Sequence, residues 1–200
     1  MPHIPVHTAL LTPAPFAPVS VADLQSHTVV EHNDDDDLQA IYIDAATAQV
    51  QADTGRAIVK QQWQASFECF PAVICLPKPP LLAVESIKYF DTDGIEQTLD
   101  PADYQVSTIG IVGRIAPAPG LSWPSVQAGR FNGVSVVYQA GHVDVVGGAP
   151  QSEAPAQLRQ AIYLLAAHFY ENREAIAPGN VSETPMAYQM LVDSLAVSAL

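Results

Sequence analysis

Residues 157–176 read QLRQAIYLLAAHFYENREAI, and this stretch decides the fold. Its apolar residues recur at the spacing of one helix face: Leu158, Ile162, Leu165 and Phe169, with Ala161, Leu164 and His168 beside them. The spacing predicts a helix with a wide apolar stripe, which must be buried against another element. The stretch carries no nucleophile, metal cluster or phosphate loop, so it is typical of an assembly component rather than a catalyst.

The same helix ends in a compact polar block, HFYENRE, at residues 168–174. Helical spacing places Tyr170, Arg173 and Glu174 on one side. Two interpretations fit this block: a helix end with its charged residues in solvent, or a polar patch that meets a neighbouring subunit. The candidate interface residues are His168, Tyr170, Glu171, Arg173 and Glu174.

The length and composition indicate one domain, or one domain with a sizeable insertion. The chain has 200 residues, of which 48% are hydrophobic, enough for a real core. Its 17 prolines are too many for a pure helical bundle. No apolar run of about 18 residues predicts a membrane span, and no basic segment precedes an apolar core as in a secretory signal. We therefore expect a soluble, cytoplasmic product.

The charge is strongly negative and unevenly distributed. The formal net charge is −13, and residues 1–55 hold eight of the 21 acids and none of the eight bases. Such a segment repels nucleic acid unless it mimics it, which argues against a groove for a phosphate backbone. The run Asp34, Asp35, Asp36 and Asp37 predicts a solvated helix start. It does not fit a calcium loop, because the acids are consecutive and the twelfth position is Ala45.

The helical elements frame a block of strands. Ser20 and Asp23 predict the start of a short helix, and a second helix over 35–54 ends at Gly55. From Ile58 the period changes to two, and runs at 62–69, 73–76, 84–90, 97–99, 104–107, 110–115 and 134–138 predict strands. Asp91–Gly94 predicts a hairpin turn rather than half a calcium loop. Pro155 fits the first turn of the long helix, and a last helix is expected from 184 or 185 to about 197.

This order predicts the α+β class: two N-terminal and two C-terminal helices with a strand-rich insertion. We expect a Pro-rich extended arm at 1–18, the first helices at 19–56, the β-rich insertion at 57–150, the long core helix at 151–177 and a C-terminal docking segment at 178–200. The stripe of the long helix is expected to pack on the helix at 35–54.

Residues with reactive side chains form no catalytic or metal-binding pattern. Cys69 and Cys75 lie in predicted strands, far from a CxxC spacing, and are expected to be buried free thiols. None of the six histidines has a partner at a metal-ligand spacing, and His168 is expected to be a packing residue. The sequence therefore predicts no enzyme, no metal and no cofactor.

Six short motifs carry a resemblance to a known family. They are Thr54-Gly55-Arg56-Ala57, Gln61-Gln62-Trp63, LPKPPL at 76–81, YFDTDG at 89–94, LDPADY at 99–104 and HFYENRE at 168–174. Their order over about residues 19–176 resembles the head–tail connector (adaptor, or head-completion) proteins of long-tailed phages. Related proteins also occur in prophages and gene transfer agents.

The resemblance implies an all-helical connector core with a β insertion, assembled as a homo-oligomeric ring, expected to have twelve copies, beneath a portal protein. Such a ring completes the DNA-filled head and joins it to a stopper or tail-completion protein. DNA passes through the channel without specific binding, and the family has no enzymatic activity, cofactor or membrane partner. The protein would then be made in the host cytoplasm and lie at the head–tail junction of the virion. The long arm at 1–18 and residues 178–200 depart from the family pattern.

Within that resemblance, we expect Asp34–Asp37 to face the channel or its rim, because residues 1–55 contain no base. Three alternatives have less support. A stopper or tail terminator is expected to be mostly β. An acidic DNA mimic is expected to spread acids over its whole surface, whereas Lys60, Lys78, Lys88, Arg114 and Arg130 interrupt the later blocks. A hydrolase lacks a nucleophile with its base.

Overall fold

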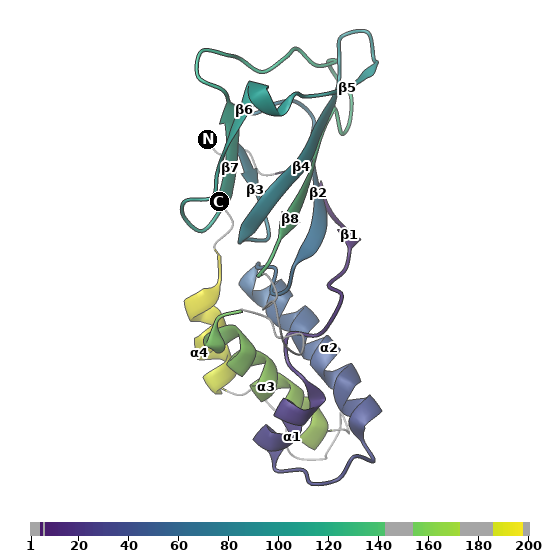
Figure 1. The fold of residues 1–200 in the computed structure, drawn as a ribbon, viewed down its shortest axis with the longest axis vertical. Coiled ribbons are helices and arrows are strands. Elements are labelled where there is room, and N and C mark those ends of the chain that lie inside the picture. Colours follow the sequence, from purple (N-terminus) through teal and green to yellow (C-terminus); the bar gives the residue numbers. More distant parts are fainter. Residues whose placement is uncertain (1–4, 6, 143–153, 173–185, 198–200) are drawn as a thin grey trace. The chain divides into compact units, whose positions relative to one another are not determined.

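The computed structural model describes residues 5, 7–142, 154–172 and 186–197. They form a mixed α+β protein, as the sequence predicts, with two compact units (Figure 1). The helical unit takes residues 15–59 and the described residues of 143–197, and the sheet unit takes residues up to 14 and 60–142. No helix in the described part of the chain is long and apolar enough to cross a membrane.

The helical unit is built around its longest helix. The helices are α1 (Val21–Thr28), α2 (Asp36–Thr54), α3 (Ala156–Glu171) and α4 (Met186–Leu195). Helix α3 packs along α2, and both α1 and α4 contact the two of them. Four residues of the predicted stripe are buried, Leu158, Ala161, Ile162 and Leu165, while Leu164, His168 and Phe169 are half-buried. The stripe packs on α2 as expected, and each fully buried Leu or Ile contributes roughly 1.5–3 kcal/mol.

The ends of these helices follow their local chemistry. Ser20 caps α1: its hydroxyl oxygen accepts the Asp23 N–H at 3.1 Å, and the Asp23 carboxylate accepts the Ser20 N–H at 3.4 Å. Gly55, at φ +69°, ends α2 in the left-handed conformation that glycine favours. Helix α3 ends at Glu171, where the Asn172 side chain donates to the His168 carbonyl at 2.9 Å. The predicted helical residues 173–176 lie outside the described residues.

The sheet unit contains two antiparallel sheets. The first has five strands in the order β1 (His7–Thr12), β2 (Gln61–Phe67), β8 (Val134–Ala140), β4 (Leu81–Phe90), β5 (Glu96–Thr98). The second has three, in the order β3 (Ile74–Leu76), β7 (Gly113–Pro117), β6 (Tyr104–Ser107). Residues 7–12, expected in an extended arm, are an edge strand paired with β2. A 3₁₀ turn at Pro101–Asp103 precedes β6.

The structure confirms the predicted hairpin turn at 91–94 but not the bounds of the predicted strand at 110–115. The hairpin at Asp91–Gly94 is confirmed: Gly94 has φ +80°, and its N–H donates to the Asp91 carbonyl at 2.9 Å. Hydrogen bonds from the Gln97 side chain and from backbone N–H groups hold the pKa of Asp91 below its usual value. The predicted strand at 110–115 was placed too early, because Gly110, at φ +101°, lies in the bend before β7.

The two cysteines occupy different environments. Cys75 lies buried in β3, as expected, but the prediction of a buried Cys69 is wrong. Strand β2 ends at Phe67, so the alternation that placed Cys69 in a strand extends two residues beyond the real strand. Cys69 is exposed, and both thiols are free.

A pH-dependent stability is expected from Tyr138, which is fully buried in β8 and donates its hydroxyl to the Pro77 carbonyl at 2.9 Å. Burial raises the pKa of Tyr138 well above its ordinary value. Above pH 10 the unfolded chain releases this proton while the folded chain keeps it, so the free energy of unfolding falls as the pH rises. From pH 8 to 11 the loss from this group is about 1.4 kcal/mol.

Urea unfolding of the protein and of Tyr138→Phe at both pH values isolates this contribution, because every other titrating group is shared. The advantage of the wild type over the variant is expected to shrink at pH 11. Parallel pH profiles would show that the hydroxyl titrates at its ordinary pKa.

A second prediction concerns Gln39, which is fully buried in α2. Its amide nitrogen and oxygen have no hydrogen-bond partner among the described residues. An unsatisfied buried polar group costs about 1–3 kcal/mol, so Gln39→Met, which keeps the length of the side chain, is expected to raise the free energy of unfolding by about 1 kcal/mol. The exposed Gln49 of the same helix is the matched control, and Gln49→Met should change stability by less than about 0.5 kcal/mol. A lower urea midpoint for Gln39→Met than for the wild type would contradict the prediction.

Candidate interaction surfaces

The polar end of α3 meets the acidic start of α2. The Tyr170 hydroxyl donates to the Asp35 carboxylate at 2.8 Å, and the rings of Phe169 and Tyr42 lie 6.3 Å apart between centroids. Residues from the two ends of the helical unit's sequence thus form one surface. The sequence analysis singled out Tyr170 and Asp35 separately, but their separation of 135 positions hid the bond between them.

Of the other predicted interface residues, the structure describes His168 and Glu171. His168 is half-buried beside Phe169, and Glu171 is exposed. Arg173 and Glu174 lie outside the described residues. The structure therefore brings Tyr170 into an interaction within the chain and leaves Glu171 at the surface, so the block is partly a packing element and partly an exposed one.

The four consecutive aspartates have different environments. Asp35 is the residue before the first turn of α2, and Asp36 accepts a hydrogen bond from the Gln25 side chain at 2.7 Å. Asp34 and Asp37 are exposed. The helix dipole favours carboxylates at this end, which explains how four neighbouring acids are tolerated. We call Asp34–Asp37 with Tyr170 the acidic end of the helical unit.

The acidity belongs mainly to the helical unit. Residues 15–59 and 143–197 contain 14 of the 21 acids and three of the eight bases, so this unit has most of the net charge of −13. A surface of this sign repels phosphate groups and favours contact with basic or uncharged partners.

A second tyrosine–aspartate pair holds the opposite end of α2. The Tyr188 hydroxyl of α4 donates to the Asp53 carboxylate at 2.6 Å. Burial, the hydrogen bond to Asp53 and the charge of Asp53 raise the pKa of Tyr188. Nearby, the Arg56 side chain donates to the Leu195 carbonyl at 2.7 Å, and burial lowers the pKa of Arg56. The spacing of apolar residues that predicts the last helix does not indicate the bond from Tyr188 to Asp53 or the bond from Arg56 to Leu195.

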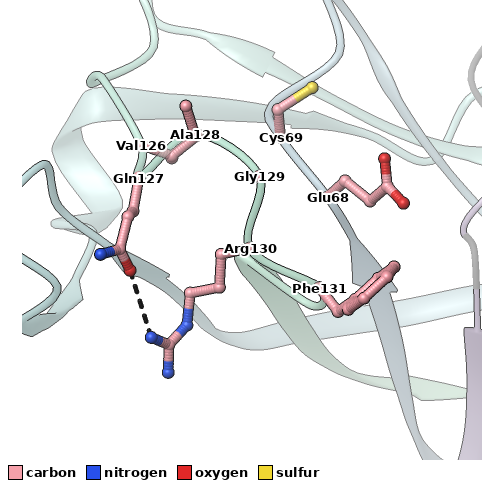
Figure 2. Close-up of a pocket in the computed structure, with 8 residues that line it drawn as sticks. All are labelled: Glu68, Cys69, Val126, Gln127, Ala128, Gly129, Arg130 and Phe131. Atoms are coloured by element: carbon pink, nitrogen blue, oxygen red, sulfur yellow. Dashed lines mark hydrogen bonds between the residues drawn. The ribbon is translucent and has the colours of Figure 1, made fainter.

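The sheet unit has a hollow of about 400 Å³ between the end of β2 and the loop before β8 (Figure 2). Its lining residues are Glu68, Cys69, Val126, Gln127, Ala128, Gly129, Arg130 and Phe131. The Arg130 guanidinium lies 3.6 Å from the centre of the Phe90 ring and donates to Gln127 at 3.2 Å. Cys69 is the lining residue best suited to act as a nucleophile, and none of the other lining residues is a histidine that could activate it.

No group of three or more potential metal ligands occurs in the described part of the chain. The described residues thus form a mixed α+β fold of two compact units.

The fold is similar to that of chains in gene transfer agent (GTA) particles. One is from the neck of an empty GTA particle, computed with C6 symmetry, with a TM-score of 0.75 and 22% identity over 98% of this chain and 97% of that one. A chain from the virion of a native GTA particle has a TM-score of 0.76 and 21% identity over the same shares. A third, from the neck of a native particle computed with C12 symmetry, has 0.74 and 22%, again over 98% and 97%.

At this level of identity the likeness establishes a shared fold over nearly the whole of both chains. No protein-family model matches the sequence, and no curated protein is significantly similar to it.

The bond between Tyr170 and Asp35 can be tested by a double-mutant cycle with Tyr170→Phe and Asp35→Ala. A hydrogen bond to a carboxylate at a half-buried site should give a coupling energy of about 1 kcal/mol in urea unfolding. Exposed Asp34 supplies the matched control: Asp34→Ala combined with Tyr170→Phe should be additive. A coupling energy near zero for the Asp35 pair would return Tyr170 to the set of residues available for a neighbouring subunit.

Proposed function

We propose that the chain is a structural component of the neck of a phage-like particle, a head–tail connector (adaptor). Copies form a ring under the portal protein, which completes the DNA-filled head and joins it to the tail. The observation that best supports this proposal is the fold. It is similar to chains of GTA neck and virion structures, with TM-scores of 0.74–0.76 over 98% of this chain and 97% of the others. The ordered motifs at residues 54–174 support the same assignment from the sequence.

The symmetry of the similar structures supports a ring. Two of them are necks computed with C6 and C12 symmetry. A cyclic ring requires each copy to use two different surfaces, one for each neighbour. We propose twelve copies, in agreement with C12, and contacts with a portal on one side and a stopper or tail-completion protein on the other.

The acidic end of the helical unit fits a place near the passing genome. Residues 1–55 contain no base, and Asp34 and Asp37 are exposed. We propose that these acids face the channel or its rim, where their charge keeps DNA from adhering to the wall. In this role the protein needs no cofactor and performs no catalysis, and it resides at the head–tail junction.

The decisive experiment mixes the full chain with its cognate portal and examines the product by negative-stain microscopy. An additional ring on the portal is expected, with cyclic averages that match the portal's symmetry. Portal and chain that are both folded, by circular dichroism, yet form no added ring would exclude the connector assignment. Portal mixed with buffer alone is the control for ring density that belongs to the portal.

A further inference from the structure

Helix α4 has an apolar face that is exposed among the residues that the structure describes. Met186 and Met190 are 80% and 69% exposed, while Tyr188 and Val192 of the same helix are buried. Residues four apart lie on the same helix face, so the two methionines form one exposed apolar ridge. Methionine side chains are long and adaptable, which suits them to contacts with another protein surface.

Helix α2 has a second exposed face, made mostly of small side chains. Ile41 is 62% exposed, and Ala45, Ala48 and Ala52 are exposed after it at spacings of four, three and four. This spacing makes one stripe along the helix, on the side away from the buried Ile43, Ala46 and Val50. Small side chains allow the backbone of another helix to approach closely.

The two faces lie on different helices of one unit, and the helix with the methionines is the shorter of the two. Helix α2 has 19 residues and α4 has 10, so they are about 28 Å and 15 Å long, and α4 fits along the exposed side of α2. Figure 1 draws α4 and α2 on either side of α3. Within one chain α4 meets α2 through its buried side, by the bond from Tyr188 to Asp53, so its methionines remain outside that contact.

We propose that the Met186–Met190 face of α4 in one copy packs on the Ile41–Ala52 face of α2 in the next copy. This inference rests on the proposed ring and names the surfaces that close it. A closed ring requires two different surfaces on each copy. The methionines of α4 and the Ile41–Ala52 face of α2 supply such a pair on one unit. The similar neck structures, computed with C6 and C12 symmetry, are the reason to assign the contact to a second copy.

The electrostatics of the contact predict its salt dependence. Asp44 flanks the stripe on α2 and Asp193 flanks the methionines on α4, and both are exposed. Apolar burial drives the association while like charges oppose it. Added salt screens that repulsion, so the contact should become stronger between about 0.05 M and 0.5 M salt.

Disulfide cross-linking of rings assembled on the portal tests the proposal. Exposed Cys69 is first replaced by serine, and Ile41→Cys and Met190→Cys are then made in separate full-length chains. Mild oxidation should give cross-linked dimers from the mixture of the two variants and none from either variant alone, because the contact joins unlike surfaces. A mixture of Met190→Cys with Ser26→Cys, an exposed position on α1, is the matched control and should give none.

The outcomes separate this inference from the function on which it rests. Dimers that form in the mixture, with a yield that rises with salt, support the contact. Rings that form on the portal without these dimers, or with Met190→Cys linked to the portal instead, overturn the contact and leave the connector function standing. A yield that falls with salt also contradicts it, since that would indicate attraction between opposite charges. Portal particles without an added ring would count against the connector function itself.

Discussion

The helical unit depends on the burial of one face of α2. Ile43, Ala46 and Val50 are buried on α2, which packs along α3, and without this packing much of the apolar stripe of α3 would face water. The two ends of α2 are fixed by hydrogen bonds from tyrosines on α3 and α4. These bonds are not equivalent. The dipole of α2 favours Asp35 at its start but disfavours Asp53 at its end, so the Tyr188 hydroxyl offsets an unfavourable placement.

Charge sets a second constraint on how this protein meets others. Most of the negative charge lies in the helical unit, whose outer surface also carries exposed apolar side chains on α2 and α4. Copies that come together through such a surface must bury enough apolar area to overcome their mutual repulsion. The same repulsion discourages random association of copies in solution.

The sequence predicts what depends on near neighbours and misses what depends on distant ones. Helix α2 and the cap of α1 follow from spacing and from Ser20, Asp23 and Gly55, whose effects act within a few residues. The pairing of β1 with β2 joins positions 50 or more apart, and β1 lies among prolines without an alternating pattern. For the same reason the surface formed by Asp35 and Tyr170 was visible only as two separate motifs. Cys69 was misplaced because alternation of apolar residues does not mark the last hydrogen bond of a strand.

The division of the helical unit between the two ends of the sequence has a consequence for biosynthesis. A ribosome releases β1, α1 and α2 before the other strands of the sheet unit, and only afterwards the helices that complete the core around α2. Until residues 156–171 emerge, the buried face of α2 has no long helix to cover it, whereas every strand of both sheets is already available. The sheet unit can therefore form before the helical unit, whose surfaces are complete only after α3 and α4 have been made.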